Sequence, residues 1–160
     1  MSLFSKPEPA PRPVTGAAPL GRDRIVRVMD QHGWVYDIDS DGDIGGFWGP
    51  DRFFFFVSGP DNCVLQVRSR WHQNLPIELR SAVREVLDEW HRQTNWPKGY
   101  TRVDDRGRLW IEAEHTVDFG AGVTDAQLDD TVVMSIRTEL QLFDFLAGRF
   151  PVTVSRKAGD

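Results

Sequence analysis

Arg52-Phe53-Phe54-Phe55-Phe56-Val57 is the most informative run in the chain. Successive side chains of a strand point to opposite faces of the sheet, so four consecutive phenylalanines make both faces of this strand apolar. An antiparallel sheet usually leaves one face to water. Two explanations are therefore open. Either chain or helix covers this central strand on both sides, or a second subunit or client protein covers one face.

Helical and extended segments alternate on both sides of this run. Apolar residues at helical spacing predict helices over 20–33 and 77–94, and the capping-box pattern from Thr124 to Gln127 begins a third. Alternating apolar and polar residues predict strands over 34–39, 44–57, 63–71, 100–103 and 108–117. Runs of strands joined by short turns pair antiparallel. The chain is thus predicted to be α+β, in the order helix-strand-strand-strand-helix-strand-strand-helix.

The 160 residues fit one domain with a terminal extension. Prolines at 7, 9, 11 and 13 disfavour helix and sheet, so residues 1–19 are predicted to form a disordered, Pro-rich arm. The domain is predicted over 20–150, and residues 151–160 form a short tail.

The charge balance argues against a nucleic-acid partner. Lys and Arg number 19 against 24 Asp and Glu, which gives a net charge of −5, and a phosphate backbone would be repelled overall. The nearest candidates for a basic patch are Arg22, Arg24, Arg27, Arg68 and Arg70. Because each has acidic neighbours, we interpret these arginines as part of a solvated surface and expect no nucleic acid to bind.

The chain is expected to act in the cytoplasm. Its single cysteine, Cys63, excludes an internal disulfide framework and suits a reducing compartment. Residues 1–20 lack the apolar core of a signal peptide. No stretch approaches the ~20 apolar residues that span a bilayer, so no membrane association is expected.

An acidic turn is the nearest approach to a metal site. Asp37, Asp39, Asp41 and Asp43, with Gly42 between them, match the first half of a calcium loop. Trp48, however, stands where that loop needs a bidentate Glu, and alternation along a strand splits the carboxylates between two faces. A plain acidic hairpin turn is the main interpretation, and a ligand- or calcium-sensing domain is the alternative.

No catalytic pattern is apparent. The four histidines, His32, His72, His91 and His115, show no metal-ligand spacing. Nucleophile elbows and glycine-rich phosphate loops are missing. The neighbouring Glu112 and Glu114 carry no other sign of a sugar site. The sequence therefore predicts a protein without catalytic residues or cofactor. A histidine beside a carboxylate in a deep pocket would reopen the enzyme hypothesis.

Aromatic residues are the remaining candidates for function. Six Trp and ten Phe are a generous supply that can fill a core, and any excess over the core favours an interaction surface. The partner-binding residues predicted for this surface are Trp48, Phe54, Phe56, Trp71 and Trp110.

Three segments resemble one known family. Gly33 to Asp43 read G-W-x-Y-x-x-D-x-D-G-D in outline, Trp96 to Tyr100 read W-P-K-x-Y, and Gly122 to Leu128 read G-x-T-D-x-Q-L. In these features residues 20–148 resemble the YbjN-domain family of bacterial sensory transduction regulators. The resemblance implies a fold like that of type III secretion chaperones, a homodimer, and a non-enzymatic regulator or adaptor that binds a protein client. It implies no catalytic residue.

Overall fold

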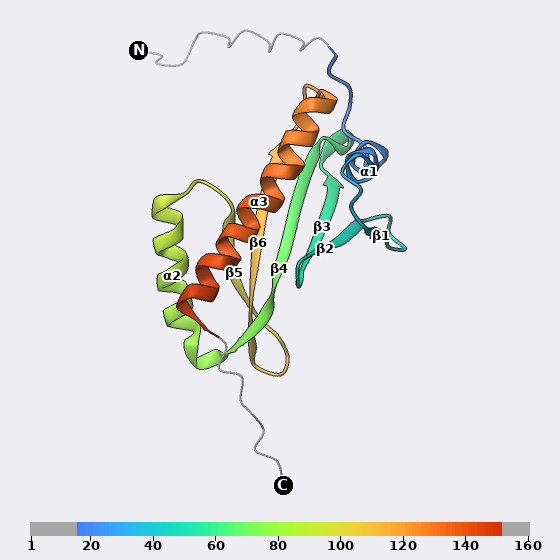
Figure 1. Cartoon of the computed structure of the whole chain (residues 1–160). Helices are drawn as coiled ribbons and strands as arrows, with labels where there is room; N and C mark the ends of the chain where they lie inside the picture. The colour runs from blue at the N-terminus through green and yellow to red at the C-terminus, as the bar shows by residue number, and fades with distance from the viewer. Residues whose placement is uncertain (1–15, 152–160) are drawn as a thin grey trace, which may run out of the picture.

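The computed structural model describes residues 16–151 and shows one antiparallel sheet with three helices (Figure 1). In chain order the elements are α1 (Arg22–Gln31), β1 (Tyr36–Ile38), β2 (Ile44–Trp48), β3 (Asp51–Ser58), the 3-10 turn η1 (Pro60–Asn62), β4 (Val64–Pro76), the 3-10 turn η2 (Ile77–Leu79), α2 (Arg80–Gln93), β5 (Lys98–Val103), β6 (Arg108–Asp118) and α3 (Asp125–Arg149). The strand order is β1-β2-β3-β4-β6-β5. The predicted α+β class with antiparallel pairing is confirmed.

The stretch predicted as one strand over 44–57 is two strands. Trp48 pairs with Asp51 and Phe47 with Arg52, so the chain reverses between them at Gly49 and Pro50. Gly49 has a φ of 62°, which a glycine adopts without strain. The sheet consequently has six strands where the sequence predicted five, because this tight turn was interpreted as an interruption within one strand.

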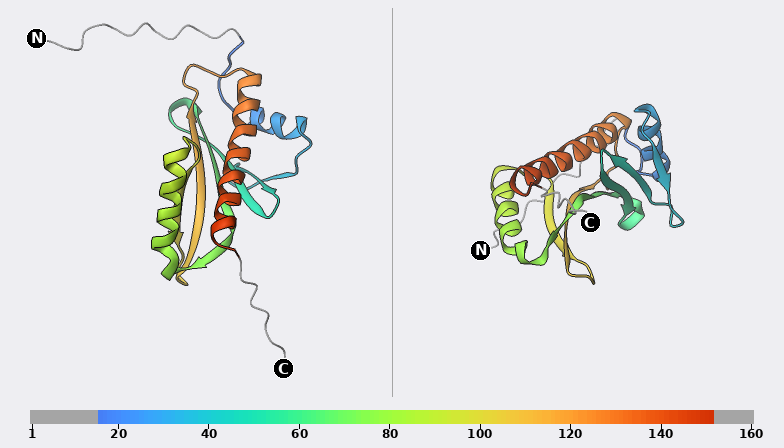
Figure 2. Two further views of the ribbon diagram at one scale, coloured as in Figure 1. Left: turned by 60° about the vertical axis from the view of Figure 1, so that its left-hand side comes forward. Right: turned by 60° about the horizontal axis from the view of Figure 1, so that its bottom comes forward.

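All three helices lie on one face of the sheet, and α3 crosses it diagonally between the other two (Figures 1 and 2). One core cluster joins α1 and the first half of α3 to β2, β3 and the start of β4, with Phe53 and Phe55 fully buried. A second cluster joins α2 and the last half of α3 to β6 and the far part of β4, around Trp71. The long α3 helix thus connects both halves of the core.

The start of α3 is fixed by the predicted capping box. The Gln127 amide donates to Thr124 Oγ1 at 3.1 Å, and the Thr124 amide donates to Gln127 Oε1 at 3.0 Å. These two bonds satisfy backbone donors that the helix itself leaves open.

Arg24 ties the start of the domain to the start of α3. Its guanidinium donates to the carbonyls of Ala18, Pro19 and Val123 and forms an ion pair with Asp125 at 2.7 Å. The prediction that Arg24 lies on a solvated surface is wrong, because the side chain fills a ring of carbonyl oxygens and is 6% exposed. Residues 16–19 of the predicted arm belong to this ordered corner, and residues 1–15 lie outside the described range.

Within the described range no helix combines the length and the apolar character needed to cross a membrane.

Candidate functional site

The sheet face opposite the helices is the candidate functional site. No helix of residues 16–151 covers it (Figure 2). We call it the open face. It is formed by Asp37 on β1, Phe47 on β2, Arg52, Phe54 and Phe56 on β3, Val64, Gln66, Arg68 and Arg70 on β4, Lys98, Tyr100 and Arg102 on β5, and Arg108, Trp110, Glu112, Glu114, Thr116 and Asp118 on β6.

The four phenylalanines divide between the two faces as predicted. Phe53 and Phe55 point into the core and are fully buried, whereas Phe54 and Phe56 lie on the open face with their rings stacked 5.9 Å apart. Neither helix nor a second layer of chain covers these two rings within the described residues. Instead, arginine side chains of neighbouring positions lie on them, which leaves both rings half-buried.

Arg52 lies between the aromatic rings of Phe47 and Phe54. Its guanidinium carbon is 4.7 Å from the Phe47 ring centre and 4.9 Å from that of Phe54. One terminal nitrogen also donates to both carboxylate oxygens of Asp37 at 2.9 Å, and this bond holds the pKa of Asp37 below its usual range. The side chain passes over Gly45, where a Cβ would lie 2.4 Å from a guanidinium nitrogen. A side chain at position 45 would therefore displace the Arg52 guanidinium from this place.

A buried carboxylate, Glu112, organises the part of the open face that β5 and β6 form. Glu112 is 2% exposed and accepts hydrogen bonds from Arg70 at 2.7 and 3.1 Å, while Arg102 lies 3.6 Å away. Burial and the negative charge of Glu112 raise the pKa of Tyr100 to about 12, so its hydroxyl stays protonated at neutral pH.

Trp110 is held between two arginines. Arg70 and Arg108 each lie 5.3 Å from its ring centre. The indole N–H donates to Asp104 at 3.1 Å, and Asp104 also accepts from the backbone and side chain of Arg108. These bonds, led by the Arg108 amide, place the pKa of Asp104 far below its ordinary value.

Arg68 stands at the centre of the open face without an ionic partner. It lies opposite Phe54 on β3 and Glu114 on β6 and stacks 5.2 Å from the Phe56 ring. Its one side-chain hydrogen bond within residues 16–151 runs from Nη2 to Gln66 Oε1 at 3.0 Å, and its buried Nε–H has no acceptor there. The guanidinium is therefore neither neutralised nor fully hydrogen-bonded by its surroundings.

The structure places three of the five predicted partner-binding residues on the open face: Phe54, Phe56 and Trp110. The other two lie on the helix side. Trp71 is 1% exposed in the second core cluster, so its predicted place on a partner surface is wrong. Trp48 packs edge-on against Trp34, Phe53 and Phe55 and borders a shallow groove beside α3.

The acidic turn uses its carboxylates locally. Asp39 Oδ1 accepts the backbone amides of Asp41 and Asp43, while Asp43 pairs with Arg22 at 3.2 Å and Asp37 with Arg52. No group of three or more potential metal ligands occurs within residues 16–151. The geometry corresponds to the hairpin-turn interpretation of this segment.

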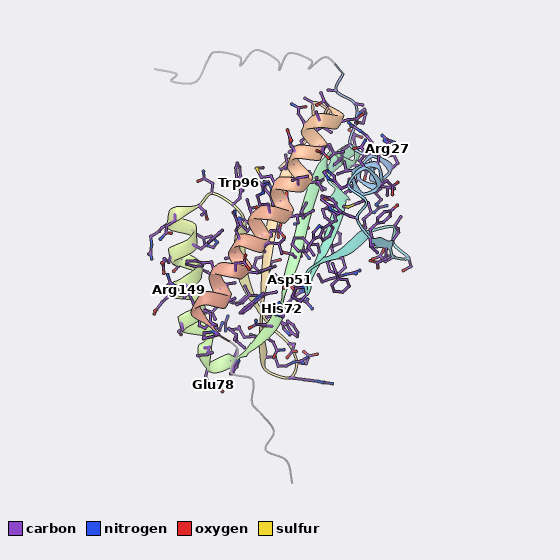
Figure 3. The ribbon with its side chains drawn as sticks, in the orientation of Figure 1. Arg27, Asp51, His72, Glu78, Trp96 and Arg149 are labelled. Carbon is purple, nitrogen blue, oxygen red and sulfur yellow. The ribbon has the colours of Figure 1, made fainter. Side chains whose placement is uncertain are left out.

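All four histidines lie beside polar groups. His32 Nε2 is 2.7 Å from the Asp129 carboxylate at the surface, and His91 Nε2 accepts the Gly99 amide at 3.0 Å and borders an open hollow together with Asp88. His72 Nδ1 is 2.8 Å from the Asp51 carboxylate, at the lower part of the sheet (Figure 3). His72 is on the surface, and no pocket encloses this pair among those that the structure describes. His115 is buried, with Nδ1 2.6 Å from Ser135 Oγ, and burial lowers its pKa. None of these four histidines lies with a carboxylate in a deep pocket, the arrangement that would indicate catalysis, because the hollow beside His91 is open to the surface.

Glu139 on α3 is a buried carboxylate that the sequence analysis missed. It is fully buried, and burial raises its pKa to about 8. The nearby Ser69 hydroxyl opposes this effect in part, although no hydrogen bond of good geometry joins the two side chains. The position falls on the apolar face of α3, and this mismatch with the helical pattern is the signal that could have revealed it.

The arrangement of one antiparallel sheet, helices on one face and a bare second face makes the chain a two-layer α+β protein. The model of one family, with the description "Putative bacterial sensory transduction regulator", matches residues 21–147. The chain therefore belongs to the YbjN family, as its sequence motifs predicted.

Solved structures show the same fold. The E. coli protein YbjN, described as a putative transcription regulator, is 12% identical, with a TM-score of 0.70 over 83% of this chain and 94% of that one. An uncharacterized protein from Methanothermobacter thermautotrophicus is 13% identical, with a TM-score of 0.54 over 82% and 99% of the two chains. No curated protein sequence matches the chain.

Proposed function

We propose that the chain is a non-enzymatic regulator or adaptor, with a chaperone-like mode of action, that works as a cytoplasmic homodimer and binds a protein client on the open face. The observation that carries this proposal is the bare face itself, where aromatic rings alternate with arginines. Aromatic residues and arginine are the types enriched at protein interfaces. Membership of a family described as sensory transduction regulators is compatible with such a role.

The edge strand β1 is the proposed dimer contact. β1 lies at one edge of the sheet. Val35, which precedes the strand, and Ile38, its last residue, are 88% and 55% exposed. The unpaired N–H and C=O groups of an exposed edge strand are a template for pairing with another chain. Antiparallel pairing of two β1 strands about a two-fold axis would extend the sheet and leave both open faces on the same side.

Solution mass, measured by size-exclusion chromatography with light scattering, tests the dimer. The wild-type chain should have twice its monomer mass of 18.3 kDa, and the double variant Val35→Lys/Ile38→Lys should be a folded monomer. A monomeric wild-type protein would refute the homodimer.

A photo-crosslinking amino acid tests client binding. Benzoylphenylalanine placed at Phe56, on the open face, should give a defined protein adduct in cells that express the chain. The same probe at Arg84, exposed on α2, should not. Adducts of equal yield at both positions would contradict a client site on the open face.

A further inference from the structure

We propose that the open face selects an acidic, extended segment of its partner, whose carboxylates alternate with apolar side chains and are received around Arg68. The inference rests on the proposed protein-binding function and names the chemistry of the partner. It depends on three features of the open face: its charge, a hollow at its centre, and the arginine side chains that lie on its aromatic rings.

The open face is positive on an acidic protein. Its strands carry six cations and four carboxylates, a formal charge of +2, whereas the whole chain carries −5. The carboxylates are also engaged. Glu112 is bound by Arg70, Asp37 by Arg52, Glu114 by Thr116, and Asp118 by the amide of Gly120. Arg68 and Lys98 form no ion pair with any described residue, and neither do Glu114 and Asp118, whose hydrogen bonds come from neutral donors. The positive character of this face therefore rests on its formal sum of +2 and on Arg68, whose buried Nε–H has no acceptor within residues 16–151.

A small hollow lies beside the unpaired arginine. It measures about 90 Å³ and is lined by Arg68, Arg70, Arg102 and Glu112 together with the rings of Phe54 and Phe56. One water molecule takes up roughly 30 Å³ in the liquid, so the hollow has room for a carboxyl group but not for a whole cofactor. Arg68 could donate to such a group, and a bidentate arginine–carboxylate bond is among the stronger hydrogen-bonded contacts.

The aromatic rings favour a peptide over a nucleic acid. Guanidinium groups already lie on the rings of Phe47, Phe54, Phe56 and Trp110. Bases that stack on aromatic platforms need free ring faces. The arginines cover part of each of these rings, and only Phe47, at 62% exposure, is largely free. The net charge of −5 also repels a long polyphosphate chain more than a short segment that carries a few carboxylates.

The strand geometry sets the spacing of the partner's carboxylates. Residues two apart in an extended segment lie roughly 6.8 Å apart on one side, which is the spacing between Arg68 and Arg70 along β4. A second copy of the open face does not have this complementarity, since face-to-face contact about a two-fold axis would bring arginines near arginines. The occupant that fits is an acidic segment of a different protein.

Fluorescence anisotropy with the full chain tests this inference. The probes are short labelled peptides in which Glu alternates with Leu, the same peptides with Gln or Lys for Glu, and labelled oligothymidylate. The Glu peptide should bind most tightly, and added salt should weaken it. Arg68→Gln should weaken this binding about tenfold, the loss expected for one charge-assisted hydrogen bond. Arg84→Gln, which removes an exposed charge from α2, should leave it unchanged.

The other outcomes overturn the inference in distinguishable ways. Equal affinity for the Glu and Gln peptides, with crosslinks at Phe56 retained, would remove the acid preference and leave the proposed function intact. Tighter binding of oligothymidylate would assign the open face to nucleic acid. Equal losses with Arg68→Gln and Arg84→Gln would mean that only net charge matters and would remove the site around Arg68. Absence of both peptide binding and crosslinks would overturn the inference and the client-binding function together.

Discussion

Replacing Glu139 by Gln should make the protein more stable at neutral pH and flatten the dependence of its stability on pH. Glu139 is fully buried between α3 and the sheet, with its pKa raised from 4.5 to about 8. In the unfolded chain the carboxyl ionises near its ordinary pKa, so folding at neutral pH requires it to take up a proton or to bury a charge.

The direction of the effect follows from proton linkage. At pH values below the pKa of the unfolded chain, Glu139 is protonated in both the folded and the unfolded state, so its ionisation does not lower the free energy of unfolding. As the pH rises towards the pKa of the folded protein, the carboxyl ionises in the unfolded chain but stays protonated in the folded one. The unfolded state is therefore increasingly favoured. The shift gives a loss on the order of 3 kcal/mol in the free energy of unfolding from about pH 5 to about pH 8, and about 5 kcal/mol once both states are ionised. Gln has a similar shape and no proton to release, so Glu139→Gln should not show this loss.

Urea unfolding followed by tryptophan fluorescence, at several pH values, measures the effect. The wild type and Glu139→Gln contain the same histidines, including the buried His115, so the contribution of the histidines cancels in the difference between the two free energies of unfolding. Glu85→Gln, which changes an exposed residue of α2, is the matched control and should follow the wild type. The reasoning is refuted if the difference between Glu139→Gln and wild type stays constant, or shrinks, as pH rises over this range.

Three further predictions concern other parts of the fold. Arg24→Met should lower the free energy of unfolding by about 1–3 kcal/mol in urea titrations, because it leaves the buried carbonyl of Val123 and the carbonyls of Ala18 and Pro19 without their donor. A loss within the range of a surface substitution would contradict the anchoring role. Thr124→Ala should lower the free energy of unfolding by about 1 kcal/mol in the same measurement, and Thr124→Ser should lower it much less, since only the serine keeps an oxygen that caps α3. Equal losses in the two variants would exclude the cap as the cause. Calorimetric titration with calcium should show no binding heat, because arginines and backbone amides hold the carboxylates of Asp37, Asp39 and Asp43. A saturable heat that Asp39→Asn abolishes would restore the ion-sensing hypothesis.

Local patterns predicted the elements of this fold well where one physical rule acts alone. The alternation of side chains on β3 correctly separated Phe53 and Phe55 from Phe54 and Phe56, and the Thr124–Gln127 pattern correctly placed the start of α3. The reversal at Gly49 and Pro50 was missed, because a two-residue turn within an aromatic run resembles a pause in one strand.

Interactions between distant positions could not be predicted in this way. Arg24 is an ordinary exposed residue by its helical position, and only the fold brings the carbonyl of Val123 to it. Likewise, no local pattern indicated that arginines of β3 and β4 would cover the second apolar face of the phenylalanine strand. Trp71 was assigned to a partner surface because its aromatic ring suits either an interface or a core, and burial alone separates the two.

The stacking of arginines on aromatic rings has a consequence for conformational entropy. A free arginine loses roughly 2 kcal/mol of rotamer freedom when it is immobilised in a complex. On the open face Arg52 is already restrained by two rings and a carboxylate, and Arg70 by Trp110 and Glu112. Folding has therefore already ordered these donors before any partner arrives. Lysine at either position would keep the charge but not this preorganisation, so affinity at this face depends on the rigidity of its cations as well as on their number.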